Sequence, residues 1–165
     1  MDLIVQKATE LGVSRIVPLI SDRTVIQLDE RSHKIERWRN VSLEACKQCG
    51  NNWLPEIPAP VKASRFLQDL GPYDLKLIGS LQPDSQPLKT ILAAARADGD
   101  DSAPARFESV LVLIGPEGDF TPAELNAAKT AGCHPLSLGP LVLRAETAAL
   151  YTLSILHHEI GRAHV

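Results

Sequence analysis

The stretch Leu113-Ile-Gly-Pro-Glu-Gly-Asp-Phe-Thr-Pro-Ala-Glu-Leu125 has the composition of a buried strand, a glycine loop and a capped helix. Thr121 is a good N-cap, Pro122 suits the first helical position, and Glu124 completes a capping box. The later stretch Leu138-Gly-Pro-Leu-Val-Leu-Arg-Ala-Glu-Thr-Ala148 repeats the design. Two such units this close predict neighbouring strands of a parallel sheet, with loops that open on one edge and form a small-molecule pocket.

The rest of the chain alternates in the same way and predicts an α/β domain, a parallel sheet flanked by helices. Ser32 is the expected N-cap of the longest helix, and residues 98–104 read as an acidic linker. Hydrophobic periodicity and breakers predict helices over residues 2–11, 32–49, 64–70, 88–97, 121–131 and 144–158, and strands over 13–20, 75–79, 110–114 and 135–138.

Length and composition indicate one domain, residues 1–158, because 165 residues with 44% hydrophobic content can bury a core. The last seven residues, 159–165, match the translation of a sequencing adapter and are interpreted as a non-native tail. A net charge of -3 restricts any nucleic-acid contact to a local basic patch. The absence of a signal or membrane-length apolar run, together with an odd cysteine count, predicts a cytoplasmic protein with no membrane partner.

The first loop is a poor phosphate cradle. It lacks the phosphate-binding glycine motifs, and Glu117 and Asp119 would repel a phosphate from the helix start. A ligand without phosphate, and with positive charge such as a sulfonium, fits better. The alternative is a well-made turn with no ligand.

The second stretch offers an apolar wall and a cation. Residues 141–143, Leu-Val-Leu, could wall an adenine, and Arg144 stands at a helix start where its charge opposes the helix dipole. Arg144 is therefore a functional candidate, with an ion pair to Glu146 or Glu117 as the structural alternative.

Other candidate residues have structural explanations that involve no ligand. Cys46 and Cys49 have half the spacing of a metal site, but Cys133 is the only other cysteine. They are interpreted as packing thiols, and no metal is expected. The basic residues of the long helix are either a solvated face or an RNA-facing patch; they are Lys34, Arg37, Arg39 and Lys47.

Together the motifs resemble the RsmE-type 16S rRNA uridine-N3 methyltransferases of the SPOUT superfamily. The resemblance covers the chain to about Leu156 and rests on Ile114-Gly-Pro-Glu-Gly118, Leu136-Ser-Leu-Gly139 and Leu143-Arg-Ala-Glu-Thr-Ala148, with Gln6-Lys-Ala-Thr-Glu-Leu-Gly-Val13 upstream. It implies S-adenosylmethionine-dependent methylation of N3 of a uridine in 16S rRNA of the small ribosomal subunit, a SPOUT fold with a C-terminal trefoil knot, and a homodimer.

The resemblance also implies site residues. Arg144 and, more weakly, Arg23 are expected to stabilise the uracil anion, and Glu146 to orient Arg144 or accept the proton. The loops after three strands are expected to bind the cofactor through Gly79, Ser80, Ile114, Gly115, Pro116, Glu117, Gly118, Leu138, Gly139, Leu143, Thr147 and Ala148.

This sequence departs from the family pattern at three points. Leu141 and Asn51-Asn52-Trp53 stand where the family usually has arginines, and the family's N-terminal PUA-like RNA-binding domain is not in this sequence. Two alternatives therefore stay open: a SPOUT methyltransferase for another rRNA or tRNA position, and an inactive knotted RNA-binding module.

Overall fold

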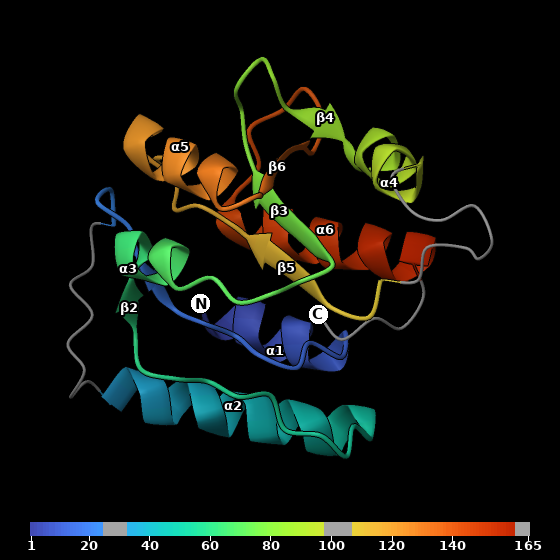
Figure 1. Ribbon diagram of the computed structural model, residues 1–165. Helices are drawn as coiled ribbons and strands as arrows, with labels where there is room; N and C mark the ends of the chain where they lie inside the picture. Colours follow the sequence, from blue (N-terminus) through green and yellow to red (C-terminus); the bar gives the residue numbers. More distant parts are fainter. Residues whose placement is uncertain (25–32, 98–106, 161–165) are drawn as a thin grey trace.

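The computed structural model describes residues 1–24, 33–97 and 107–160. Six helices and six strands lie in these ranges (Figure 1). The helices are α1 (Asp2–Glu10), α2 (His33–Cys49), α3 (Ala63–Gln68), α4 (Leu88–Ala97), α5 (Pro122–Thr130) and α6 (Ala145–Ile160), and the strands are β1 (Leu19–Ile20), β2 (Val61–Lys62), β3 (Leu75–Gly79), β4 (Gln86–Pro87), β5 (Val110–Leu113) and β6 (His134–Ser137).

The main sheet has the order β4-β6-β3-β5, and all its strand pairs are parallel. Leu77 lies opposite Val112 of β5 on one side and His134 of β6 on the other. The predicted parallel sheet is thus confirmed, but the prediction that the strands before the two glycine loops are neighbours is wrong. β3 separates β5 from β6. Because every strand is parallel, the two loops still emerge at the same edge of the sheet.

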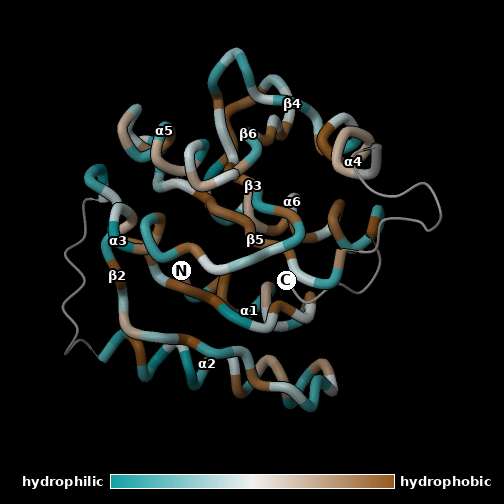
Figure 2. Tube along the Cα trace, in the orientation of Figure 1, coloured by the Kyte–Doolittle hydropathy of each residue, from teal (hydrophilic) through white to brown (hydrophobic). Residues whose placement is uncertain are grey.

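The two faces of the sheet carry separate cores, as the alternation of side chains along a strand requires. Leu75 and Leu77 of β3 face α4 and α6, where Leu92 and Leu156 are buried. Ile78 faces the opposite way, toward α3 and α5. Figure 2 shows the hydrophobic colour concentrated along β3 and β5, in the middle of this three-layer arrangement.

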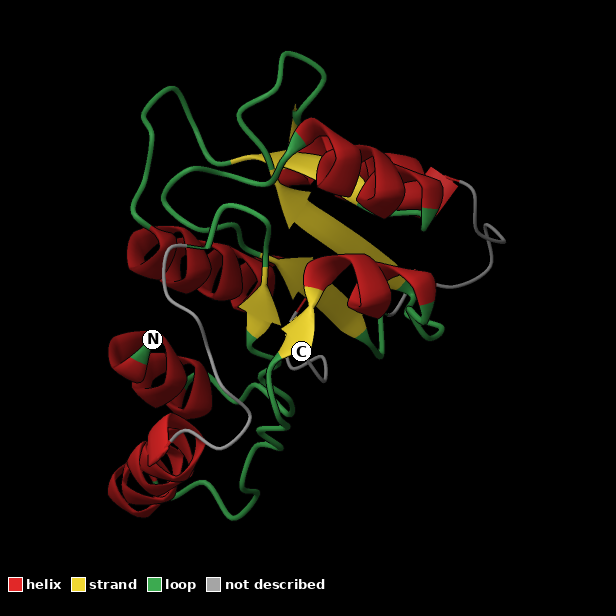
Figure 3. Cartoon of the chain, turned by 90° about the vertical axis from the view of Figure 1, so that its left-hand side faces the viewer, coloured by secondary structure: helices red, strands yellow, loops and turns green. Residues whose placement is uncertain are grey.

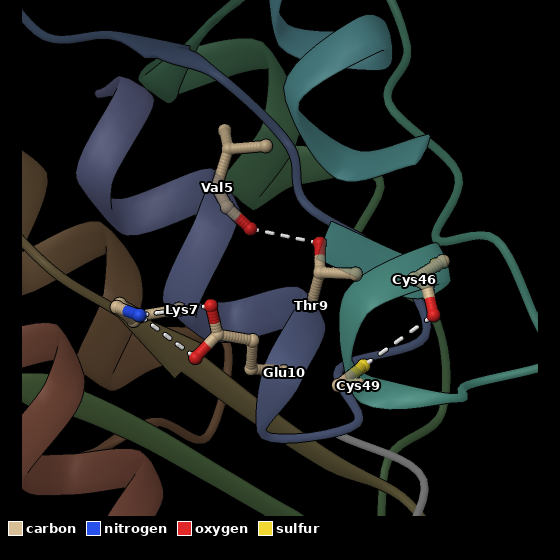
Figure 4. Close-up of polar contacts among 6 residues, drawn as sticks. All are labelled: Val5, Lys7, Thr9, Glu10, Cys46 and Cys49. Atoms are coloured by element: carbon tan, nitrogen blue, oxygen red, sulfur yellow. Dashed lines mark hydrogen bonds and ion pairs between the residues drawn. The ribbon is translucent and has the colours of Figure 1, made fainter. Parts of the chain in front are cut away.

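Helices α1 and α2 form a further layer on the N-terminal side, set apart from the sheet in Figure 3. Val5 packs there with Ile35 and Trp38. Thr9 donates to the carbonyl of Val5 at 2.8 Å (Figure 4) and shares a buried 3.0 Å hydrogen bond with Ser42 of α2. Polar groups buried between the two helices are therefore paired, as burial away from water demands.

The predicted strand over residues 13–20 is mostly wrong. Only Leu19–Ile20 form a ladder, with β2, and an isolated parallel bridge joins Arg15 to Glu56. The partner segment contains Pro58 and Pro60, which have no N–H to donate, so the ladder between these two points is interrupted. The short strands β2 and β4 were not predicted, since neither has an apolar pattern.

The helix predictions hold to within a few residues. The capping box of α5 is present: the Thr121 side chain accepts from the Glu124 backbone and the Glu124 side chain accepts from the Thr121 backbone. Helix α6 continues past the predicted end at residue 158, and Ile160 packs against the core. Ser32, residues 98–104 and residues 161–165 lie outside the described residues. No helix in the described part is long and apolar enough to cross a membrane.

Candidate functional site

A pocket lies at the edge of the sheet where β3, β5 and β6 end. Three loops and the first turns of α6 enclose it. Carboxyl ends of parallel strands are where α/β proteins usually bind ligands. The lining residues are Gly79, Ser80, Leu81, Ile114, Gly115, Pro116, Glu117, Asp119, Leu136, Leu138, Gly139, Leu141, Val142, Leu143, Ala145 and Ala148.

The loop after β5 is a tight turn closed by a backbone hydrogen bond. The Asp119 N–H donates to the Pro116 carbonyl at 2.9 Å, and the Asp119 carboxylate accepts from the Phe120 N–H at 2.8 Å. Asp119 has a φ of 60°, whereas Gly115 and Gly118 do not have positive φ. The left-handed conformation in this glycine loop therefore lies at an aspartate, a residue type that tolerates it, and not at either glycine.

A glycine is required at position 115 because there is too little space for a side chain. A Cβ at Gly115 would lie 3.2 Å from the Asp119 carboxylate and 3.2 Å from the Phe120 ring. Phe120 is buried in the core beneath the loop, so it has little freedom to move. The pocket floor at this point is backbone that a ligand can approach closely.

The loop after β6 provides an exposed apolar wall. Leu141 and Val142 are 72% and 73% exposed, although both line the pocket. Gly139, which begins this loop, has a φ of 108° that other residues rarely adopt. Two adjacent exposed aliphatic side chains facing a pocket are typical of a surface that an apolar ligand covers.

The loop after β3 forms the third wall. The Ser80 N–H donates to the Leu136 carbonyl of β6 at 3.0 Å, and the Ser80 hydroxyl accepts from the Gln82 N–H at 3.2 Å. Ser80 is buried, so these bonds fix the loop against β6. Gly79 and Ser80 line the pocket as predicted.

The structure brings most of the predicted cofactor residues together. Only Gly118 and Thr147 are not on the pocket wall, although each is next to a residue that is. Leu81, Leu136 and Ala145 also line the pocket and were not among the predicted cofactor residues. Of these, Leu136 lies inside β6, where a strand interior gives no signal for a pocket. Leu141 and Val142, which were expected to wall an adenine, line the pocket, and so does Asp119, whose charge was noticed without a contact being assigned to it.

The three candidate catalytic residues surround the pocket without lining it. Arg144 directly precedes α6 and is exposed. Its carbonyl accepts from the Ala148 N–H at 2.8 Å, and among the described residues its side chain forms no ion pair with Glu146 or Glu117. Glu146 lines a neighbouring groove that shares residues 114–117 with the pocket. The structural alternative for Arg144, an ion pair to either glutamate, is therefore not realised here.

Arg23 contacts the first loop at Gly118. Its guanidinium donates to the Gly118 carbonyl, and a Cβ on Gly118 would lie 3.5 Å from the Arg23 side chain. Arg23 is exposed, so its charge remains available to solvent. Arg23 and Arg144 are therefore each adjacent to a pocket loop, from segments far apart in sequence: Arg23 by contact with Gly118, and Arg144 as the neighbour of Leu143 and Ala145.

A buried carboxylate lies beneath the same loop. Glu124 is 5% exposed and accepts hydrogen bonds from Ser21, Asp22 and Thr121. Burial alone would raise the pKa of Glu124, but the hydrogen bonds from Thr121, Asp22 and Ser21 outweigh burial and lower that pKa. Glu124 is therefore an anion in the folded protein at neutral pH.

The cysteines have structural roles. The Cys49 thiol donates to the Cys46 carbonyl at 3.8 Å (Figure 4), and the Cys46 thiol donates to the Trp53 carbonyl at 3.5 Å. The described residues contain no group of three or more His, Cys, Asp or Glu side chains able to hold a metal ion. The packing interpretation of Cys46 and Cys49 fits these contacts.

The basic residues of α2 are largely engaged. Arg37 pairs with Asp2, Arg39 donates to the Ile57 carbonyl at 2.8 Å, and Lys47 pairs with Glu44 at 2.7 Å. Such contacts account for these side chains without RNA. Both interpretations of the α2 charges, a solvated face and an RNA-facing patch, stay predictions.

Comparison with known proteins gives consistent matches. A family model described as an RNA methyltransferase domain matches residues 1–157. The chain is 32% identical over 152 residues to the ribosomal RNA small subunit methyltransferase E of Synechocystis, covering 92% of this chain and 46% of that protein. It is 30% identical over 161 residues to the protein of the same name from Bacillus subtilis, covering 96% and 61%.

Solved structures match as well. A putative methyltransferase from Legionella pneumophila, in complex with the bound cofactor SAM, superposes with a TM-score of 0.82 at 36% identity, covering 96% of this chain and 60% of that chain. A ribosomal RNA small subunit methyltransferase E from Neisseria gonorrhoeae, bound to S-adenosyl methionine, gives 0.78 at 30%, with the same coverage. The chain spans about half to three-fifths of the length of these relatives.

Proposed function

The chain belongs to the family of RNA methyltransferase domains, and from this premise we propose that it binds S-adenosylmethionine and methylates N3 of a uridine in 16S rRNA. The substrate follows the names of its relatives, which are ribosomal RNA small subunit methyltransferases. The trefoil knot, a homodimer and a cytoplasmic location are parts of the same proposal and stay predictions.

The observation that carries the proposal is the convergence of three separate loops on one pocket. The loops after β3, β5 and β6 were each expected to bind the cofactor, and each lines that pocket. Leu141 and Val142 offer an apolar surface suited to an adenine, while Glu117 and Asp119 add negative charge suited to a sulfonium. Two solved relatives are described with this cofactor bound.

The residues present fit the chemistry of methyl transfer. The bound cofactor would supply an electrophilic methyl group on a sulfonium. N3 of uridine must lose its proton first, which costs about two pKa units, or roughly 2.7 kcal/mol at neutral pH. Arg144 is the first candidate to offset this cost, because an unpaired guanidinium can stabilise the uracil anion.

Glu146 has a supporting role in the proposal. Its carboxylate lines the groove beside the pocket, where it can accept the N3 proton. To orient Arg144 as well, its side chain would have to move, because the two form no ion pair among the described residues. The remaining rate enhancement comes from alignment of N3, methyl carbon and sulfur by the pocket walls. Arg23 would add positive charge from the other side of the loop, through its contact with Gly118.

Cofactor binding is tested first, by the melting temperature of the protein with S-adenosylmethionine. A ligand at a hundred times its Kd stabilises the folded state by about 2.7 kcal/mol. The same shift is expected in Arg144→Ala, because Arg144 is outside the pocket wall. A melting temperature of the wild-type chain that S-adenosylmethionine leaves unchanged would refute the cofactor proposal.

Catalysis is tested by single-turnover methyl transfer to small ribosomal subunits. Arg144→Ala should lower the rate by about a hundredfold or more, the range for loss of one group that stabilises transition-state charge, with cofactor affinity nearly unchanged. Equal losses of rate and affinity would make Arg144 a structural residue. Mapping the methylated nucleotide distinguishes N3 of a 16S rRNA uridine from another position.

A further inference from the structure

Glu124 accepts more hydrogen bonds than its helix needs. Its Oε2 accepts from the Thr121 N–H at 2.8 Å and from the Thr121 hydroxyl at 3.0 Å, which completes the cap of α5. Two further bonds come from residues more than a hundred positions earlier in the chain: the Ser21 hydroxyl and the Asp22 N–H each donate at 3.1 Å. The cap does not require this second pair.

The second pair fixes a compact turn. Within it, the Thr24 N–H donates to the Ser21 carbonyl at 2.9 Å, and the Ser21 N–H donates to the Thr24 hydroxyl at 3.0 Å. The Arg23 N–H also reaches the Ser21 hydroxyl, at 3.3 Å. The backbone on both sides of Arg23 is thereby held, and the anchor for the whole turn is the Glu124 carboxylate.

Arg23 projects from this turn onto the pocket loop. Its guanidinium donates to the Gly118 carbonyl, between the pocket-lining residues Glu117 and Asp119. The aliphatic part of Arg23 also packs against Gly118, where a side chain would be 3.5 Å away. The buried Glu124 carboxylate therefore joins the α5 start to the turn that carries Arg23, and Arg23 in turn contacts the pocket loop at Gly118.

We propose that Glu124 is a positioning residue, whose buried carboxylate fastens the turn of residues 21–24 to the start of α5, directly after the pocket loop, and so sets the place of the Arg23 guanidinium beside the site. The inference rests on the proposed function, because it assigns Arg23 to the methyl-transfer site. It adds a residue that touches neither cofactor nor substrate. A buried carboxylate that accepts hydrogen bonds both from its own helix start and from a segment a hundred residues away is well suited to this role, since charge-assisted bonds are stronger than neutral ones.

The test is a double-mutant cycle on single-turnover methyl transfer from S-adenosylmethionine to small ribosomal subunits. Glu124→Gln keeps the side-chain size but turns one acceptor oxygen into a donor. Glu124→Gln and Arg23→Ala should each slow the transfer, by up to about a hundredfold if the site shifts by an ångström. The double variant should be no slower than Arg23→Ala alone. Losses that multiply would overturn the proposal, because the two residues would then act independently.

Two further variants separate positioning from capping. Ser21→Ala removes a bond between the turn and Glu124 and leaves the cap intact, so it should slow the reaction. Thr121→Ala removes the hydroxyl of the cap and leaves both bonds to the turn, so its rate should stay near that of wild type despite a lower melting temperature. If Thr121→Ala is as slow as Glu124→Gln, capping suffices and the inference fails.

A measurement without RNA keeps the inference apart from the proposed function. Backbone hydrogen exchange at residues 22–24 should be faster in Glu124→Gln and Ser21→Ala than in wild type, and unchanged exchange would refute the anchoring role. This result does not depend on methylation. Failure of the wild-type chain to bind S-adenosylmethionine would instead refute the proposed function and leave the exchange result standing.

Discussion

Replacement of Gly139 by alanine should weaken S-adenosylmethionine binding while the protein remains folded. Gly139 has a φ of 108° at the start of the loop that carries the apolar wall of the pocket. No atom lies within 4 Å of the place a Cβ would take, so steric overlap is not the issue. The cost is conformational, because residues with a side chain rarely adopt this φ.

The magnitude follows from the strain of such a conformation. A non-glycine residue held there costs about 1–3 kcal/mol, which is small beside the roughly 5–15 kcal/mol stability of a typical domain. The exposed loop can relieve this strain by moving, and Leu141 and Val142 would move with it. Cofactor binding must then restore the original loop, so the Kd should rise about 5-fold to 150-fold, at tenfold per 1.4 kcal/mol.

The assay is calorimetric measurement of the Kd for S-adenosylmethionine, with Gly71→Ala as the matched control. Gly71 also has open space around its Cβ position, but its φ is not positive and it lies outside the pocket. Gly71→Ala should therefore bind like wild type. If Gly139→Ala also binds within about twofold of wild type and melts at the same temperature, the loop conformation does not determine the pocket.

Two other measurements test the electrostatics and the thiols. The pKa of Glu124 is lowered in the folded state, so its stabilising contribution is complete above the ordinary value of 4.5 and is lost as pH falls through the folded-state value. The advantage of the wild type over Glu124→Gln in unfolding free energy should therefore shrink as pH drops from about 6 to about 3. An advantage independent of pH would contradict this reasoning. Burial raises the pKa of the Cys133 thiol to about 11, even though the nearby Lys76 acts to lower it, whereas Cys49 is exposed. Iodoacetamide at about pH 8 should therefore modify Cys49 well before Cys133, as measured by peptide mass. The reverse order would contradict the burial argument.

Local sequence patterns identified the elements of this site well. The α5 capping box is visible in Thr121, Pro122 and Glu124 because capping depends on residues three positions apart. The run from Leu141 to Leu143 was apolar where a loop should be polar, and that conflict between composition and place marked a binding surface. The resemblance then assigned a cofactor to loops that physical reasoning alone had joined in one pocket.

Other features depended on partners far away in the chain. The failed strand over residues 13–20 has an apolar, β-branched sequence, but its pairing is interrupted by Pro58 and Pro60 of the partner segment. The predicted strand order was wrong because it also depends on distant segments: a strand's neighbour is set by how helices pack on each face, and β3 lies between β5 and β6. No local pattern contains this information.

The sequence by itself determined an α/β domain with two glycine loops at the ends of parallel strands, and it predicted a cofactor of positive charge without phosphate. Only the tertiary structure decided that Asp119 has the left-handed conformation in the first loop and that Glu124 of α5 is bonded to the turn of residues 21–24. It also decided that, in the described part of the chain, Arg144 forms no ion pair with Glu117 or Glu146. The physical reason is the distance along the chain between the residues that determine each feature. Caps, turns and amphipathic faces are set by neighbours within one or two turns of chain, whereas the pairing of a buried charge depends on segments that only folding brings together.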